Sequence, residues 1–266
     1  YYLYGTRGFV NFGEAHGFDV YVSADLENWS EPKEIFTASP DFWATENFWA
    51  PEVHKYRGKY YMLASFKSET ACRGTQILVS DTPDGKFVPL TDKPITPDEW
   101  ECLDGTLYID KSGKPYMVFC HEWTQVKDGE MCAIGLSDDL KTAVGKPFLL
   151  FRASEPLWAE KIKDNWVTDG PFMYRTGNGE LLMIWSSGTN KAYVEAVSYS
   201  DNGEITGNWK HCDKLLFDEN GGHGMIFKSF DGKLNFVMHY PNEPYGAERA
   251  EITEIKEISE EPYLCV

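Results

Sequence analysis

The run Val20-Tyr21-Val22-Ser23-Ala24-Asp25-Leu26 is an alternating strand that ends in a serine and an acidic turn, and the chain repeats it. Further copies are Ile77-Leu78-Val79-Ser80-Asp81, Ile134-Gly135-Leu136-Ser137-Asp138-Asp139-Leu140 and Val197-Ser198-Tyr199-Ser200-Asp201, with a degenerate fifth copy at 248–255. Ser23, Ser80 and Ser137 follow one another at intervals of 57 residues. A fixed interval of this size indicates a repeated supersecondary unit.

A second pattern, a glycine turn followed by an apolar and aromatic strand, alternates with the first. Its copies are Gly58-Lys59-Tyr60-Tyr61-Met62, Gly113-Lys114-Pro115-Tyr116-Met117, Gly179-Glu180-Leu181-Leu182-Met183 and Gly232-Lys233-Leu234-Asn235-Phe236. The opening Tyr1-Tyr2-Leu3-Tyr4 matches the strand half of this unit. Each unit of roughly 55 residues therefore has the size of one four-stranded propeller blade with its loops.

Five such units predict an all-β fold, a five-bladed β-propeller that residues 1–266 form as one domain. Helical periodicity is nearly absent, while period-two alternation and Gly-Lys, Asp-Gly and Asn-Gly turns dominate. A β-sandwich would also contain many short strands, but it would not repeat at this interval. Because the chain opens on what should be the second strand of a blade, we expect the first inner strand to be missing at the N-terminus.

The charge of the chain limits its partners. The 25 basic and 42 acidic residues give a formal net charge of −17. Such a surface repels phosphate backbones and anionic lipids, so we expect neither nucleic acid nor a membrane as a partner. No run approaches the 18 apolar residues of a membrane span. A neutral oligosaccharide or polysaccharide meets no such objection, and 9 Trp, 15 Tyr and 16 Phe offer flat faces for sugar rings.

The six cysteines show neither a CxxC pair nor a zinc-binding spacing, and we expect them to be buried free thiols. Free thiols slightly favour the cytoplasm, although the sequence leaves the localisation undetermined. The chain also has no glycine-rich phosphate loop, no HExxH motif and no GxSxG motif.

Ionisable residues lie just upstream of each glycine turn, where a propeller places its innermost strands. These segments are Trp49-Ala50-Pro51-Glu52-Val53, Leu103-Asp104-Gly105-Thr106-Leu107, Thr168-Asp169-Gly170-Pro171-Phe172 and Gly222-His223-Gly224-Met225-Ile226. Such groups could simply satisfy backbone amides between blades. However, Asp104, Asp169 and His223 from three blades would meet at one end of the channel, as acid–base chemistry requires. Two or three carboxylates around a pit suit glycoside hydrolysis without a cofactor.

The ordered set of segments resembles family 43 of the glycoside hydrolases over all 266 residues. Trp49-Ala50-Pro51-Glu52 is similar to the family's Trp-Ala-Pro-Asp, Asp169-Gly170-Pro171-Phe172 to its Glu-Gly-Pro, and Gly222-His223-Gly224 to its Gly-His segment. The resemblance implies an inverting glycosidase, namely an α-L-arabinofuranosidase, a β-xylosidase or an endo-arabinanase. It also implies three acids: a base, a pKa modulator and a general acid.

The resemblance gives Asp104 the role of modulator and Asp169 the role of general acid. Asp169 departs from the family, which has Glu there, and its side chain is shorter by about 1.5 Å. Glu122, in His121-Glu122-Trp123, is a second candidate for the acid. The family's base belongs to an Asp-Pro pair that would precede Tyr1, so no residue of this sequence is assigned to it.

We expect the remaining site residues to contact sugar or a metal ion. The predicted sugar contacts are Phe48, Trp49, Glu52, Trp100, His121, Trp123 and Arg249. His223 resembles the family's axial histidine, which implies a hydrated structural Ca²⁺ at the propeller axis, although the chemistry itself requires no cofactor. Two other functions stay open: a sugar-binding propeller without catalysis, and a relative that cleaves with phosphate. The sequence does not decide between exo and endo action.

Overall fold

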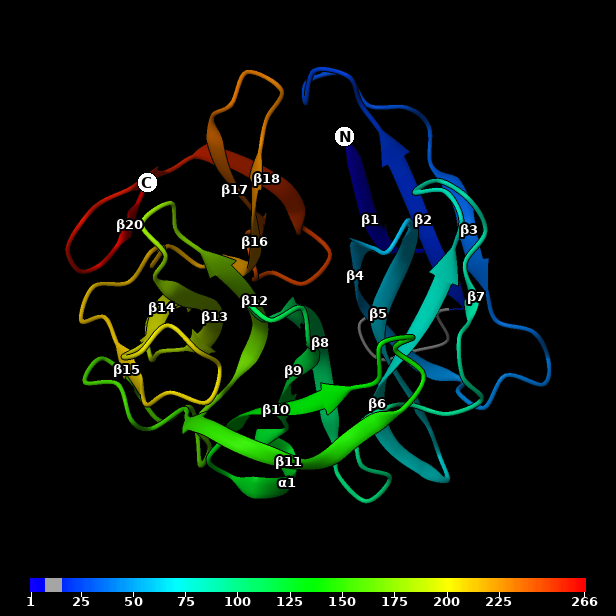
Figure 1. Cartoon of the computed structure of the whole chain (residues 1–266), viewed down its shortest axis with the longest axis horizontal. Coiled ribbons are helices and arrows are strands. Elements are labelled where there is room, and N and C mark those ends of the chain that lie inside the picture. The colour runs from blue at the N-terminus through cyan, green and yellow to red at the C-terminus, as the bar shows by residue number, and fades with distance from the viewer. Residues whose placement is uncertain (8–15) are drawn as a thin grey trace.

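The computed structural model describes residues 1–7 and 16–266, and in it five antiparallel sheets surround a common centre as the blades of a β-propeller (Figure 1). The sheet orders are β1-β2-β3, β4-β5-β6-β7, β8-β9-β10-β11, β12-β13-β14-β15 and β16-β17-β18. Both sequence patterns therefore mark blades, and the predicted all-β, five-bladed fold is confirmed.

The strands of each blade follow the chain from the centre outward. The strands that carry the ionisable segments are β4 (Glu46–Tyr56), β8 (Cys102–Ile109), β12 (Asp169–Arg175) and β16 (Gly222–Lys228). The strands after the glycine turns are β5 (Lys59–Ser68), β9 (Pro115–His121), β13 (Leu181–Gly188) and β17 (Leu234–Tyr240). The strands of the serine pattern are β2 (Gly17–Val22), β6 (Ala71–Ser80), β10 (Glu130–Leu136), β14 (Tyr193–Ser200) and β18 (Arg249–Glu254).

The outermost strands and a few short elements complete the described chain. The outermost strands are β3 (Lys33–Thr37), β7 (Val88–Pro89), β11 (Ala143–Arg152) and β15 (Trp209–His211). One helical turn, α1 (Trp123–Val126), follows β9, and β19 (Lys256–Glu257) pairs with β20 (Leu264–Cys265) near the C-terminus. No helix among residues 1–7 and 16–266 is long and apolar enough to cross a membrane.

The first blade shows how the chain's opening strand fits the repeat. β1 (Tyr2–Thr6) pairs with β2 as β5 pairs with β6, so it stands in the place of a second strand. At the seam with the last blade, the Tyr1 ring lies 4.3 Å from that of Phe230 and 6.0 Å from that of Phe227, between centroids. A preceding inner strand stays a prediction.

The glycine of each turn is required by the backbone. Gly58, Gly113, Gly179 and Gly232 have φ values between +86° and +97°, a region that side chains with a Cβ rarely adopt. The recurrence of glycine in the sequence pattern is therefore a consequence of hairpin geometry and not of function.

Apolar faces of neighbouring blades pack against one another to form the core. Blades one and two share a cluster of phenylalanines, and blades three and four share one around the fully buried Trp185. Cys120 belongs to the cluster around Trp185, and Cys102, Cys132 and Cys212 belong to two further core clusters, as expected of small hydrophobic groups. Cys72 and Cys265 are free but only partly buried, so the expectation that all six thiols are buried is wrong for these two. The packing of the clusters fixes the blades and thereby the ends of their inner strands.

An irregularity recurs at the start of all four inner strands that the structure describes. The register with the second strand shifts between Trp49 and Glu52, and equally between Leu103 and Thr106, Asp169 and Phe172, and Gly222 and Met225. Within each shift one residue has a positive φ: Ala50 (+48°), Asp104 (+56°), Gly170 (+50°) and His223 (+53°). Such β-bulges redirect side chains next to functional sites.

Candidate active site

The bulges of three blades meet at one end of the propeller. The Gly170 amide donates a hydrogen bond of 3.0 Å to Asp104 Oδ2, and the Asp104 amide donates one of 2.9 Å to Ser65 Oγ. A Cβ added to Gly170 would lie 2.7 Å from Cγ and Cδ2 of His223, so only glycine fits between these neighbours. His223 Nδ1 in turn lies 3.8 Å from Asp104 Oδ2. Asp104, Gly170 and His223 are therefore packed together. The sequence analysis predicted that Asp104 and His223 would meet at one end of the channel, and the structure brings these two residues together.

Asp169 lies one residue before the bulge position of its strand, beside this group. Its Oδ2 accepts a hydrogen bond of 3.2 Å from the Tyr193 hydroxyl at the start of β14. Burial, and then the negative charge of Asp104, raise the pKa of Asp169 from 3.8 to about 7, against the opposing effects of His223 and Tyr193. Asp169 therefore holds its proton at mildly acidic pH, as a general acid must.

Tyr193 is itself held by an aromatic neighbour. Its ring stacks on His239 of β17 at 5.5 Å between centroids and 22° between planes. Burial lowers the pKa of His239 to about 4, and its Nε2 lies 2.9 Å from Asn242 Oδ1. A neutral imidazole thus supports the phenol that touches Asp169. Tyr193 and His239 carry no sequence signal, because they lie on the third strand of blade four and the second strand of blade five, and only the fold brings these positions together.

Trp49 and Glu122 meet on the same end of blades two and three through Arg73. The Arg73 guanidinium lies 4.6 Å from the Trp49 ring centroid, forms an ion pair with Glu122 and donates a bond of 3.0 Å to Asn47 Oδ1. Burial raises the pKa of Glu122, and the charge of Arg73 opposes that rise. Trp49 is half-buried, and its contact with sugar stays a prediction.

Glu52 is engaged inside the channel. Thr106 donates a hydrogen bond to its carboxylate, His54 Nε2 contacts the same oxygen, and the His54 ring stacks on Phe172. Glu52 and Thr106 hold equivalent places, two residues after the bulge positions. These contacts describe a structural role, and a sugar contact for Glu52 stays a prediction.

Phe48 does not line the site. Its ring is fully buried and packs among Phe18, Phe36, Phe42 and Phe66. A ring without exposed surface, packed among four other phenylalanines, has no face left for a ligand. The prediction that Phe48 contacts sugar is therefore wrong.

The other predicted sugar contacts belong to blades three and five, and their contact with sugar stays a prediction. Trp100 stacks on His121 at 4.1 Å and 9°, and His121 also contacts Glu130 at 3.0 Å and Gln125 at 2.8 Å. Because its ring and both nitrogens are engaged, His121 contributes to packing within blade three. Trp123 is half-buried at the start of α1. Arg249 is exposed at the start of β18, where it donates to the carbonyls of Gly246 and Glu248.

The residues around His223 do not supply a protein cage for Ca²⁺. This ion takes six to eight oxygen ligands, whereas His223 offers nitrogen and the adjacent Asp104 is already bonded to Gly170. Within residues 1–7 and 16–266, no three His, Cys, Asp or Glu side chains are grouped to hold a metal. The hydrated ion implied by the resemblance stays a prediction, and no chemical step is routed through it.

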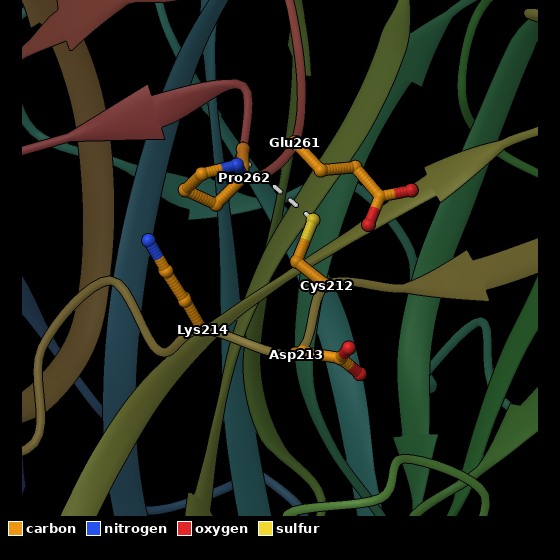
Figure 2. A pocket seen from close by; sticks show the side chains of 5 residues that line it. All are labelled: Cys212, Asp213, Lys214, Glu261 and Pro262. Atoms are coloured by element: carbon orange, nitrogen blue, oxygen red, sulfur yellow. Dashed lines mark hydrogen bonds between the residues drawn. The ribbon is translucent and has the colours of Figure 1, made fainter.

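The pocket drawn in Figure 2 lies away from these carboxylates. Its volume is about 180 Å³, and Cys212, Asp213, Lys214, Glu261 and Pro262 line it beside the C-terminal hairpin. Cys212 Sγ donates a weak bond to the Pro262 carbonyl at 3.7 Å. None of the sequence patterns points to this pocket. The Cys212 side chain is buried in the hydrophobic core.

Comparison with known proteins gives the same assignment along the chain. The model of "Glycosyl hydrolases family 43" matches residues 1–258. An extracellular endo-α-(1→5)-L-arabinanase from Bacillus subtilis is 32% identical over 124 residues, which cover 43% of this chain and 38% of that protein. A xylosidase/arabinosidase from Humicola insolens is 30% identical over 81 residues, or 30% of this chain and 24% of that protein. The alignments thus span less than half of these relatives.

Solved structures match over nearly the whole fold. An endo-arabinase from Bacteroides thetaiotaomicron superposes with a TM-score of 0.91 and 42% identity, covering 97% of this chain and 90% of that one. An endo-1,4-β-xylanase from the same organism gives 0.77 and 26%, covering 97% and 87%. With the family model spanning the five blades, the chain belongs to family 43 of the glycosyl hydrolases.

Proposed function

We propose that the chain hydrolyses α-1,5-linked L-arabinan by internal cleavage with inversion at the anomeric carbon. The observation that carries the proposal is Asp169, a carboxyl group whose pKa is raised to about 7 at the meeting point of three blades. The linkage comes from the Bacillus subtilis arabinanase, and the endo mode comes from that protein and from the Bacteroides endo-arabinase, which is 42% identical and covered over 90% of its length.

In this mechanism Asp169 protonates the leaving oxygen of the glycosidic bond. A proton on Asp169 is retained because burial and the Asp104 charge disfavour ionisation. Asp104 is fixed by the Gly170 amide, so its charge stays beside the acid during the reaction. Tyr193 orients the Asp169 carboxyl through Oδ2, which leaves the other oxygen for the substrate.

The attacking water requires a base on the opposite face of the sugar. Among residues 1–7 and 16–266 we assign this role to no carboxylate. The resemblance places the base on a strand before Tyr1, in an Asp-Pro pair, and this assignment stays a prediction.

Glu122 is the weaker candidate for the acid. It forms an ion pair with Arg73, which favours its charged form and occupies the carboxylate. Asp169 has no cation within its hydrogen-bonding shell among the described residues; its partner is the neutral phenol of Tyr193. A proton donor needs the protonated form, so the environment of Asp169 suits the role better.

Cleavage by phosphate finds no support in the arginines. Arg7 is paired with Asp19 and Glu34, Arg73 with Glu122, and Arg249 lies on a different blade from both. No specific observation favours a phosphate site over a water-binding one.

The test is a digest of linear arabinan, with products separated by length and the first product's anomer followed by proton NMR. Hydrolysis into a ladder of oligosaccharides with inverted configuration supports the proposal. Release of arabinose alone would overturn the endo mode. Binding of arabino-oligosaccharides without any cleavage would favour the sugar-binding propeller instead.

A further inference from the structure

Glu195 is a buried carboxyl group that the proposed reaction does not use. It lies on β14 in the middle of blade four and is fully buried. In the sheet, Asp169 is paired with Ser186 on β13, and Ser186 is paired with Glu195 on β14. The three residues form one row that runs from the candidate acid into the blade.

Ser186 connects this row to the neighbouring blade. Its hydroxyl donates to the Glu195 carboxyl group and accepts a hydrogen bond of 2.6 Å from the His223 backbone amide. The preceding glycine allows this approach, because a Cβ on Gly222 would lie 2.6 Å from Ser186 Oγ and 3.1 Å from Glu195 Oε2. Glu195 therefore fixes the direction of the Ser186 hydroxyl. That hydroxyl accepts the hydrogen bond from the His223 amide, which lies in the bulge of β16.

The bulge needs such a support. His223 has φ +53°, a conformation that costs about 1–3 kcal/mol in a non-glycine residue unless its surroundings hold it. Its ring sits against Gly170 and faces Asp104 at 3.8 Å. A small rotation of the His223 backbone would therefore move the ring against the start of β12, which carries Asp169 and Gly170.

A purely structural residue at position 195 would not need to be ionisable. Burying a carboxyl group without a cation costs several kcal/mol in the charged form, and an apolar side chain would fill the same volume. Burial raises the pKa of Glu195 to about 8, partly offset by hydrogen bonds from Ser186 and the backbone amides of Gly224 and His223. Its carboxyl oxygen accepts a hydrogen bond from Ser186, which an apolar side chain could not do.

We propose that Glu195 and Ser186 are positioning residues that hold His223, and through it Asp104 and Asp169, in reactive geometry. The catalytic part of this statement rests on the proposed function, whereas the placement of His223 does not. Neither residue touches substrate. Their effect is on the arrangement of the groups that do.

The experiment compares Ser186→Ala and Glu195→Met with Glu195→Gln, whose amide oxygen still accepts from Ser186. Ser198→Ala is the matched control, because Ser198 is equally buried and bonds Trp185 and His211 instead. For each variant we would measure kcat and KM on arabino-oligosaccharides, the melting temperature, and the NMR signals of the His223 imidazole.

Ser186→Ala and Glu195→Met should lower kcat by about tenfold or more with KM within about twofold, and should shift the His223 signals. Glu195→Gln should restore most of that loss, and Ser198→Ala should change only the melting temperature. If Ser186→Ala behaved like Ser198→Ala, with His223 unmoved, the positioning role would be wrong. If no variant or wild type cleaved arabinan but the His223 signals still shifted, only the proposed activity would fail.

Discussion

The amide of Gly170 donates a hydrogen bond to Asp104 Oδ2 over 3.0 Å, which joins blade three to the residue that follows Asp169 in blade four. The negative charge of Asp104 is thereby held next to the candidate acid. Because like charges disfavour ionisation, the Asp104 charge raises the pKa of Asp169.

Removing that charge should lower the pKa of Asp169. In Asp104→Asn, the alkaline limb of the pH profile, where the acid loses its proton, should move toward lower pH by about one unit. A ¹³C NMR titration of the Asp169 carboxyl group measures the same change without relying on residual activity. An unchanged or raised Asp169 pKa in this variant would contradict the modulator role.

Tyr193 should act with the opposite sign. Its hydrogen bond stabilises the charged form and so lowers the pKa of Asp169. Tyr193→Phe should therefore move the alkaline limb toward higher pH, by less than the Asp104→Asn shift. The two variants control for each other. General damage to the site would move the alkaline limb of both variants in the same direction, whereas the predicted shifts are opposite.

Asp169 should also make stability depend on pH. Its pKa is about 7 in the folded protein and 3.8 ordinarily, so between these values the unfolded chain ionises first and stability falls as pH rises. The difference amounts to at most about 4 kcal/mol above pH 7. Asp169→Asn should melt near the wild-type temperature at pH 4 and several degrees above it at pH 8. Equal melting temperatures of the wild type and Asp169→Asn at pH 8 would show that the pKa of Asp169 is not raised in the folded protein.

Gly170 should tolerate no side chain. Gly170→Ala combines a positive φ with a contact of 2.7 Å to the His223 ring, whereas Gly179→Ala at φ +97° meets nothing within 4 Å. Both variants should lose about 1 kcal/mol or more from backbone strain. Only Gly170→Ala should also lose activity, measured as kcat on arabinan. Equal activity in the two variants would argue against close packing at the bulges.

The sequence predicted the repeat because hairpin geometry demands glycine at each turn, and it predicted Asp104 and His223 because ionisable residues recur just upstream of these turns. It could not show that Asp169 stands one residue before the bulge position, since the register shift is a property of paired strands. Ser186, Tyr193 and Glu195 reach the site from second and third strands, and no local pattern marks them. Phe48 was misplaced because the register of β4 shifts around it, and that shift, which the sequence does not reveal, decides which side chains of the segment face the blade interior.

The central claim is that Asp169 is the proton donor, and the most direct measurement compares Asp169→Asn on two substrates. One is arabinan, whose leaving group needs protonation, and the other is an arabino-oligosaccharide with a dinitrophenyl leaving group, which does not. We predict a loss of about 10²–10⁴-fold on arabinan and a far smaller loss on the dinitrophenyl substrate. Equal losses on both, or a selective loss in Glu122→Gln instead, would contradict the assignment.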